Sequence, residues 1–192
     1  MYTSECIFPS KRNEWCTMNG IRIIGLSIAF CIVYGVLLDQ ITVRICVEYF
    51  TIGHPIIIRT NDPTQLGIVW GVVATWWVGL LFGIPLSFAA RYGPAPKRNA
   101  SQLVRPMLIL MMVCGVFASL LGGMGFVAAS NGWVFLVGDL KGRIPLDRHT
   151  YFIADLWAHC ASYFFGFAGG IFLIVMTWRS RRSFKVSVPQ TP

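Results

Sequence analysis

The chain alternates between long apolar segments and short polar ones. Four apolar stretches stand out, at residues 21–41, 66–90, 107–129 and 152–178. A hydrocarbon core about 30 Å thick requires roughly 20 apolar residues of helix, and each stretch is long enough. The run from Leu108 to Leu121 is continuously apolar, without the alternation that strands of a membrane barrel require. The pattern predicts an all-α membrane protein, a four-transmembrane-helix bundle.

The spans divide the 192-residue chain into three parts. Residues 1–20 are predicted to form a cytoplasmic leader, residues 21–178 the transmembrane domain and residues 179–192 a basic cytoplasmic tail. A composition of 55% hydrophobic and 12% charged residues agrees with one polytopic domain. No small-residue cleavage pattern follows the first span, so we expect that span to be retained.

Basic residues gather in three segments that four spans would bring to one side of the membrane. These segments precede span one, join spans two and three, and follow span four: Lys11, Arg12 and Arg22; Arg91, Lys97, Arg98 and Arg105; Arg179, Arg181, Arg182 and Lys185. The positive-inside rule then places both termini in the cytoplasm. This bias, with attraction to anionic membrane lipids, accounts for the net charge of +8. Nucleic acid is therefore not expected as a partner.

Two further patterns concern packing and the outer loops. Small residues recur every four positions at 115, 119 and 123 and at 162, 166 and 170, which predicts close helix packing inside the bundle. Residues 55–60 and 133–137 have the β-branched and aromatic content of strands bounded by turn residues. A small extracytoplasmic β cap over the bundle is a further expectation.

Polar residues mark the outer ends of spans one and four. On a helix, Gln40, Arg44 and Glu48 share one face, and Asp155 and His159 lie one turn apart. The rise per residue places Arg44 and Asp155 at about the same outer level. Because ionisable residues near membrane depth usually face the bundle interior, the sequence predicts a polar cluster of Asp39, Gln40, Arg44, Glu48, Asp155 and His159.

Two kinds of site fit this cluster. If Arg44 faces Asp155 and Glu48, the cluster is a buried ion-pair network that fixes helix register, and this is the preferred interpretation. The alternative is a metal site, because nitrogen and carboxylate donors suit zinc, iron or manganese. Its candidate ligands are Glu48, His54, Asp155 and His159. No cofactor is required by the preferred interpretation.

The function remains open among three classes. Motifs for a nucleophile elbow, a metalloprotease helix or a phosphate-binding loop are absent, and the six cysteines contain no C-x-x-C pair. We expect a non-catalytic accessory, assembly or sensing component of the membrane, with lipids, another membrane protein or a second copy as partners. The alternatives are a metal-dependent membrane enzyme acting on a lipid or envelope substrate, and a small transporter or channel subunit.

One segment also carries a resemblance. The residues Asp39-Gln40-x-Thr42-x-Arg44-x-Cys46-x-Glu48-Tyr49-Phe50-Thr51-x-Gly53-His54-Pro55, with Asp155-Leu156-Trp157-Ala158-His159, resemble a group of uncharacterised bacterial four-span integral membrane proteins. The resemblance covers roughly residues 30 to 180. It implies a bacterial inner (cytoplasmic) membrane protein with four spans, and no established activity comes with it.

Overall fold

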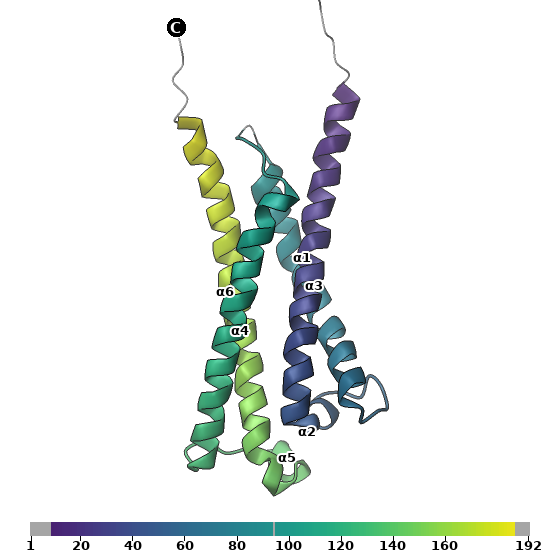
Figure 1. Cartoon of the computed structure of the whole chain (residues 1–192), viewed down its shortest axis with the longest axis vertical. Coiled ribbons are helices and arrows are strands. Elements are labelled where there is room, and N and C mark those ends of the chain that lie inside the picture. The colour runs from purple at the N-terminus through teal and green to yellow at the C-terminus, as the bar shows by residue number, and fades with distance from the viewer. Residues whose placement is uncertain (1–8, 94, 187–192) are drawn as a thin grey trace, which may run out of the picture.

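Within the described part of the chain, six α-helices and one 3-10 turn make up a long bundle. The computed structural model describes residues 9–93 and 95–186. Four long helices, α1 (Pro9–Ile45), α3 (Pro63–Arg91), α4 (Ala100–Ser130) and α6 (His149–Val186), run along the molecule (Figure 1). The short elements α2 (Val47–Thr51), α5 (Asp139–Arg143) and the turn Leu146–Arg148 lie together at one end. We refer to this end as the α2 end.

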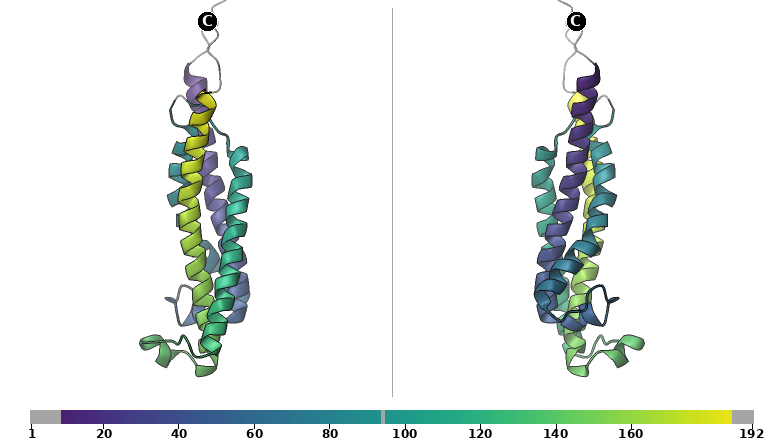
Figure 2. Two further views of the ribbon diagram at one scale, coloured as in Figure 1. Left: turned by 90° about the vertical axis from the view of Figure 1, so that its left-hand side faces the viewer. Right: turned by 90° about the vertical axis from the view of Figure 1, so that its right-hand side faces the viewer.

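The four long helices confirm the predicted all-α bundle. Each forms most or all of a segment long and apolar enough to cross a membrane: Met18–Ile45, Pro63–Arg91, Ala100–Ser130 and Leu146–Arg181, the last of which begins in the 3-10 turn before α6. Helix α1 begins within the predicted leader, and α6 extends into the predicted tail. Both helices point their free ends away from the α2 end (Figures 1 and 2).

The prediction of a small β cap is wrong. The part of the chain that the structure describes contains no strand, and residues 55–60 and 133–137 follow irregular paths. Two isolated short strands are marginal in stability. The second loop instead turns at Gly138, whose φ is 64°, and continues into α5.

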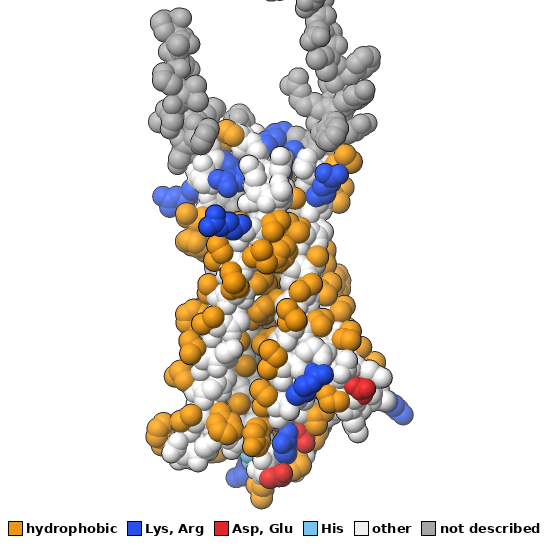
Figure 3. Space-filling view, in the orientation of Figure 1, with side chains coloured by type: hydrophobic (Ala, Val, Ile, Leu, Met, Phe, Trp, Pro, Cys, Tyr) orange, Lys and Arg blue, Asp and Glu red, His pale blue; other side chains and the backbone are white. Residues whose placement is uncertain are grey.

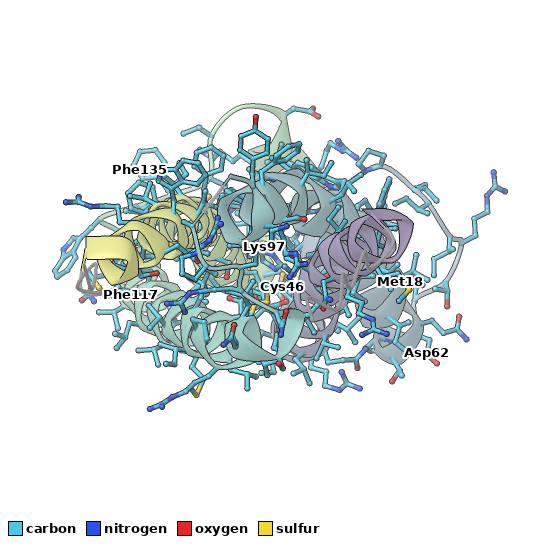
Figure 4. All side chains as sticks on the ribbon, turned by 90° about the horizontal axis from the view of Figure 1, so that it is seen from above. Met18, Cys46, Asp62, Lys97, Phe117 and Phe135 are labelled. Carbon is cyan, nitrogen blue, oxygen red and sulfur yellow. The ribbon has the colours of Figure 1, made fainter. Side chains whose placement is uncertain are left out.

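The bundle consists of two helix pairs. Helix α1 packs mainly against α3, and α4 packs mainly against α6, whereas the pairs share fewer contacts. In the view from above, Met18 and Asp62 lie on one side, and Phe117 and Phe135 on the other (Figure 4). The two pairs therefore pack more closely within themselves than against each other.

A stripe of small residues on α3 allows α1 to approach closely. A Cβ added at Gly71 would stand 2.5 Å from the Cα of Val36, and one at Gly79 would stand 2.5 Å from the Cα of Ile28. Backbones this close leave no room for side chains. The α3 stripe, which the sequence analysis did not single out, has a small residue at every fourth position: Gly67, Gly71, Thr75, Gly79 and Gly83.

Of the two stripes of small residues that were predicted to pack inside the bundle, one faces the interior and the other does not. The one on α6 faces inward, and all three of its members line an interior cavity: Ser162, Gly166 and Gly170. The prediction is wrong for the α4 stripe, since Ser119 and Gly123 are exposed. Helix α4 packs instead through Cys114, Ala118 and Gly122, one residue earlier at each turn.

At the end opposite α2, Arg181 links α6 to the C-terminus of α3. Its side chain is buried and donates hydrogen bonds to four backbone carbonyls that end α3 or belong to the following loop: Ala89, Tyr92, Ala95 and Pro96. Carbonyls at a helix C-terminus lack partners within the helix. A guanidinium group with five N–H donors satisfies several of them at once.

Candidate functional site

The site begins where α1 breaks. Cys46 adopts an extended conformation, with φ −146° and ψ 95°, between the end of α1 and the start of α2. It is fully buried and lies near the centre of the bundle's cross-section in the view from above (Figure 4), and burial raises the pKa of its thiol to about 12. Because of this break, Glu48 leaves the helical face that it was predicted to share with Gln40 and Arg44.

Three of the predicted residues meet inside the bundle, between α1 and α6. Asp39, Asp155 and His159 are exposed by only 4%, 1% and 8%. The Nε2 atom of His159 lies 3.2 Å from the hydroxyl of Thr42 and 3.8 Å from Oδ1 of Asp39. Asp155 lies close enough to Asp39 for the two acids to repel each other. Neither carboxylate oxygen of Asp155 accepts a hydrogen bond from any residue in the described ranges.

Gln40 and Arg44 lie on a different face of α1, toward the start of α3. Arg44 donates to the side-chain oxygen of Gln40 at 2.7 Å and to the hydroxyl of Thr64 at 3.0 Å. It is exposed. The prediction that Arg44 pairs with Asp155 or Glu48 is wrong, because the register of α1 turns Asp39 and Thr42 toward α6 and Arg44 away from it.

Glu48 has a different cationic partner, Arg148. The Nε atom of Arg148 lies 3.1 Å from a carboxylate oxygen of Glu48, and its Nη2 donates to the carbonyl of Ile45 at 2.8 Å. Burial opposes the charged form of Glu48. Hydrogen bonds from its own backbone N–H, from Arg148 and from the Cys46 thiol outweigh that effect, so the pKa of Glu48 is lowered. Arg148 thus ties the start of α6 to the end of α1.

Aromatic rings surround the buried polar group. The ring of Tyr49 stacks on His159, with centroids 4.7 Å apart, and lies 4.8 Å from the ring of His54. His54 donates through Nδ1 to the carbonyl of Tyr49 at 2.7 Å and lies 4.8 Å from the ring of Trp70. Burial raises the pKa of the Tyr49 hydroxyl.

The four candidate metal ligands are not brought together. His54 and His159 both contact Tyr49, whereas Glu48 is engaged with Arg148 and Asp155 has no hydrogen-bond partner among the residues described. Within those residues, no three His, Cys, Asp or Glu side chains form a group that could hold one metal ion.

A cavity of about 260 Å³ extends from the polar group between the two helix pairs. At the α2 end it is lined by Asp39, Tyr49, Phe50, His54, Trp70 and His159. Further along, the hydroxyls of Tyr34 and Ser162 lie 2.8 Å apart, and the far end is apolar, with Leu86, Met107, Leu173 and Ile174. No Lys or Arg belongs to this lining.

The cavity also reaches the outer surface between α3 and α6. Its lining includes Trp77 and Leu81 on α3 and Phe167 on α6, each of which is about half exposed. The helices that border this opening, α3 and α6, belong to segments apolar enough to cross a membrane, and hydrophobic side chains cover much of the middle of the bundle on the face shown in Figure 3. In a bilayer, this opening would face hydrocarbon rather than water.

The cavity and most of its lining were not predicted from the sequence. Tyr34, Tyr49 and Trp70 come from three different elements, and no local pattern distinguishes a cavity-lining aromatic residue from a core one. One available signal was the i, i+3 spacing of Asp39 and Thr42, which places them on one face of α1.

Comparisons with protein-family models, with curated protein sequences and with solved structures give no match.

Proposed function

We propose that this chain is a multi-pass integral membrane protein that binds a membrane-soluble amphipathic molecule in the cavity between its two helix pairs. Its role is non-catalytic: it senses or holds that molecule, as an accessory component of the membrane. The observation that carries the proposal is an interior cavity with apolar walls and one polar end. Ligand sites commonly combine such walls with a few convergent polar groups.

The position of the cavity supports entry from the bilayer. Its opening lies between α3 and α6, where Trp77, Leu81 and Phe167 are exposed. A ligand with a hydrocarbon tail can move laterally from lipid into this opening without crossing water. Its head would then meet Asp39, His54 and His159 at the α2 end.

The proposal includes an orientation and a location. The orientation rests on the basic residues near the ends of the spans. Toward the end opposite α2 the structure describes Arg22, Arg91, Lys97, Arg98, Arg105, Arg179 and Arg181. Toward the α2 end it describes fewer, Arg44, Arg59, Lys141, Arg143 and Arg148. By the positive-inside rule the end opposite α2 faces the cytoplasm, so both termini are cytoplasmic and the polar site lies near the outer face. We propose a bacterial cytoplasmic membrane as its location.

Quenching of tryptophan fluorescence tests ligand binding. Two probes share one brominated tail, 11-bromoundecanol and 11-bromoundecyl trimethylammonium, and bromine in the cavity would quench Trp70 and Trp77, which line it. In phosphatidylcholine nanodiscs we expect saturable quenching by at least one probe. If both probes quench only in linear proportion to their concentration, as lipid partitioning alone would give, the proposed function is wrong.

Two glycine substitutions provide the matched comparison. A Cβ at Gly166 points into the cavity, with Cys114 Sγ 3.9 Å away, whereas one at Gly123 meets nothing within 4 Å. Gly166→Phe should fill the cavity and remove the saturable quenching. Gly123→Phe, which adds the same side chain outside the cavity, should retain it.

A further inference from the structure

The lining at the polar end of the cavity contains a carboxyl group and, among the described residues, no Lys or Arg. The carboxyl group belongs to Asp39, and Asp155 lies close behind. Arg148, which acts electrostatically on Asp155, is engaged by Glu48 and by the Ile45 carbonyl. An acid in an apolar interior requires a compensating cation or a proton. Among the described residues, no Lys or Arg lies within ion-pair distance of Asp39. The one ionisable nitrogen of these residues in that range is Nε2 of His159, 3.8 Å from Oδ1 of Asp39, which is a cation only when the imidazole is protonated.

The two imidazoles add hydrogen-bond acceptors to this end. His54 donates Nδ1–H to a carbonyl, so the other nitrogen of its neutral ring accepts. The Thr42 hydroxyl donates to the carbonyl of Leu38 at 3.2 Å and therefore accepts from Nε2–H of His159, which leaves Nδ1 of His159 as an acceptor. These hydrogen positions are assigned from the partners' geometry.

Aromatic faces complete a surface suited to positive charge. Tyr49, Phe50 and Trp70 line the same end as Asp39. The faces of aromatic rings carry negative electrostatic potential, and clusters of rings recognise quaternary ammonium groups. A phosphate or carboxylate head would meet Asp39 with no Lys or Arg in the lining to offset the repulsion.

We propose that the ligand is a lipophilic cation, an ammonium head on a hydrocarbon tail, with Asp39 as its counter-ion. This inference rests on the proposed function and adds the charge of the ligand to it. The apolar walls receive the tail, and the carboxylate, the two imidazole acceptors and the rings receive the head. A neutral head satisfies the acceptors but leaves the carboxylate uncompensated.

The two brominated probes separate the effect of the head's charge on affinity from the effect of the hydrocarbon tail. In wild-type protein, 11-bromoundecyl trimethylammonium should quench saturably with at least tenfold higher affinity than 11-bromoundecanol. An anionic probe with the same tail, 12-bromododecanoate, should give no saturable quenching. Equal affinity for the cation and the alcohol, or tighter binding of the anion, would overturn the inference while leaving the proposed function intact.

Asp39→Asn tests the counter-ion. The amide is nearly isosteric, and circular dichroism of Asp39→Asn measures whether the variant folds as wild type does, so the alcohol probe serves as the reference for its cavity. Its affinity for the ammonium probe should fall at least tenfold. Unchanged preference for the cation in Asp39→Asn, or in a second variant, Asp39→Ala, that still binds the alcohol, would refute the role assigned to Asp39. If neither probe binds wild type, the proposed function itself fails.

Discussion

At the scale of single residues, the ion pair of Glu48 and Arg148 links the end of α1, the first long helix, to the start of α6, the last. Its atoms are 3.1 Å apart, and both side chains are partly shielded from solvent, with exposed fractions of 19% and 28%. Arg148 also satisfies the carbonyl of Ile45, where α1 ends. The pair therefore contributes both charge attraction and helix capping at the same place.

The pH dependence of this contact follows from the lowered pKa of Glu48. Its pKa in the folded protein lies below the ordinary value of 4.5, so the stabilisation is complete above the unfolded-state pKa and is lost as pH falls through the folded-state pKa. At pH 7, Glu48→Gln should destabilise the protein by ~1 kcal/mol. The difference in thermal unfolding between variant and wild type should shrink as the solution is acidified below pH ~4.5.

An exposed ion pair at the same end supplies the control. Asp139 and Arg143 lie 3.3 Å apart with side-chain exposures of 82% and 54%, and such pairs contribute little. Asp139→Asn should therefore change unfolding by less than about 0.5 kcal/mol at any of these pH values. A Glu48→Gln effect that is constant across the acid range would show that charge on Glu48 is not involved.

The part of the site that was hardest to predict from the sequence is which side chain pairs with which. Asp39, Asp155 and His159 were identified because ionisable groups stand out in apolar helices, and the structure brings them together. The partner of Glu48 was not identified, because Arg148 is 100 residues away and the break at Cys46 redirects Glu48. Local periodicity extends only as far as a helix stays regular.

At the scale of helices, the close contact between α1 and α3 depends on glycines of α3, which have no side chain. A methyl group at Gly79 would lie 2.5 Å from the Cα of Ile28 and 2.8 Å from the carbonyl oxygen of Ser27. Both atoms belong to backbone that cannot move aside without displacing α1. We therefore expect Gly79→Ala to destabilise the protein by about 1–3 kcal/mol, the usual cost of overpacking.

Gly123 on α4 gives the opposite expectation. It is also within a helix, but nothing lies within 4 Å of an added Cβ, so Gly123→Ala should be neutral or stabilising by up to about 1 kcal/mol through helix propensity. Unfolding in mixed detergent, followed by circular dichroism, measures both. Similar effects of the two substitutions would mean that α1 and α3 do not pack as described.

The helices themselves were predictable, and their pairing was not. Runs of apolar residues near the thickness of a bilayer identify spans, but an all-apolar helix gives little indication of which face meets a neighbour. The stripe at positions 115, 119 and 123 and the stripe on α3 look equivalent in sequence. Only the second meets a backbone in the structure.

At the scale of the whole molecule, the orientation in the membrane remains a prediction. Single cysteines introduced at residues 97 and 185 of a cysteine-free variant should react with a membrane-impermeant maleimide only from the cytoplasmic side. A cysteine replacing Ile56, which is 73% exposed in the loop before α3, should react only from the opposite side. Labelling of residues 97 and 185 from different sides would mean that the chain does not cross the membrane twice between them, and would contradict the four-span topology.

Arg181 has a consequence for the order of assembly during synthesis. Ala89, whose carbonyl it binds, precedes it by 92 residues. At roughly 5–20 residues per second, the end of α3 would wait about 5 to 18 seconds after translation for that partner. Until then, water, lipid head groups or the insertion machinery must satisfy the same carbonyls. The connection between α3 and α4 is thus completed last, by the helix that emerges last, although it joins two segments made much earlier.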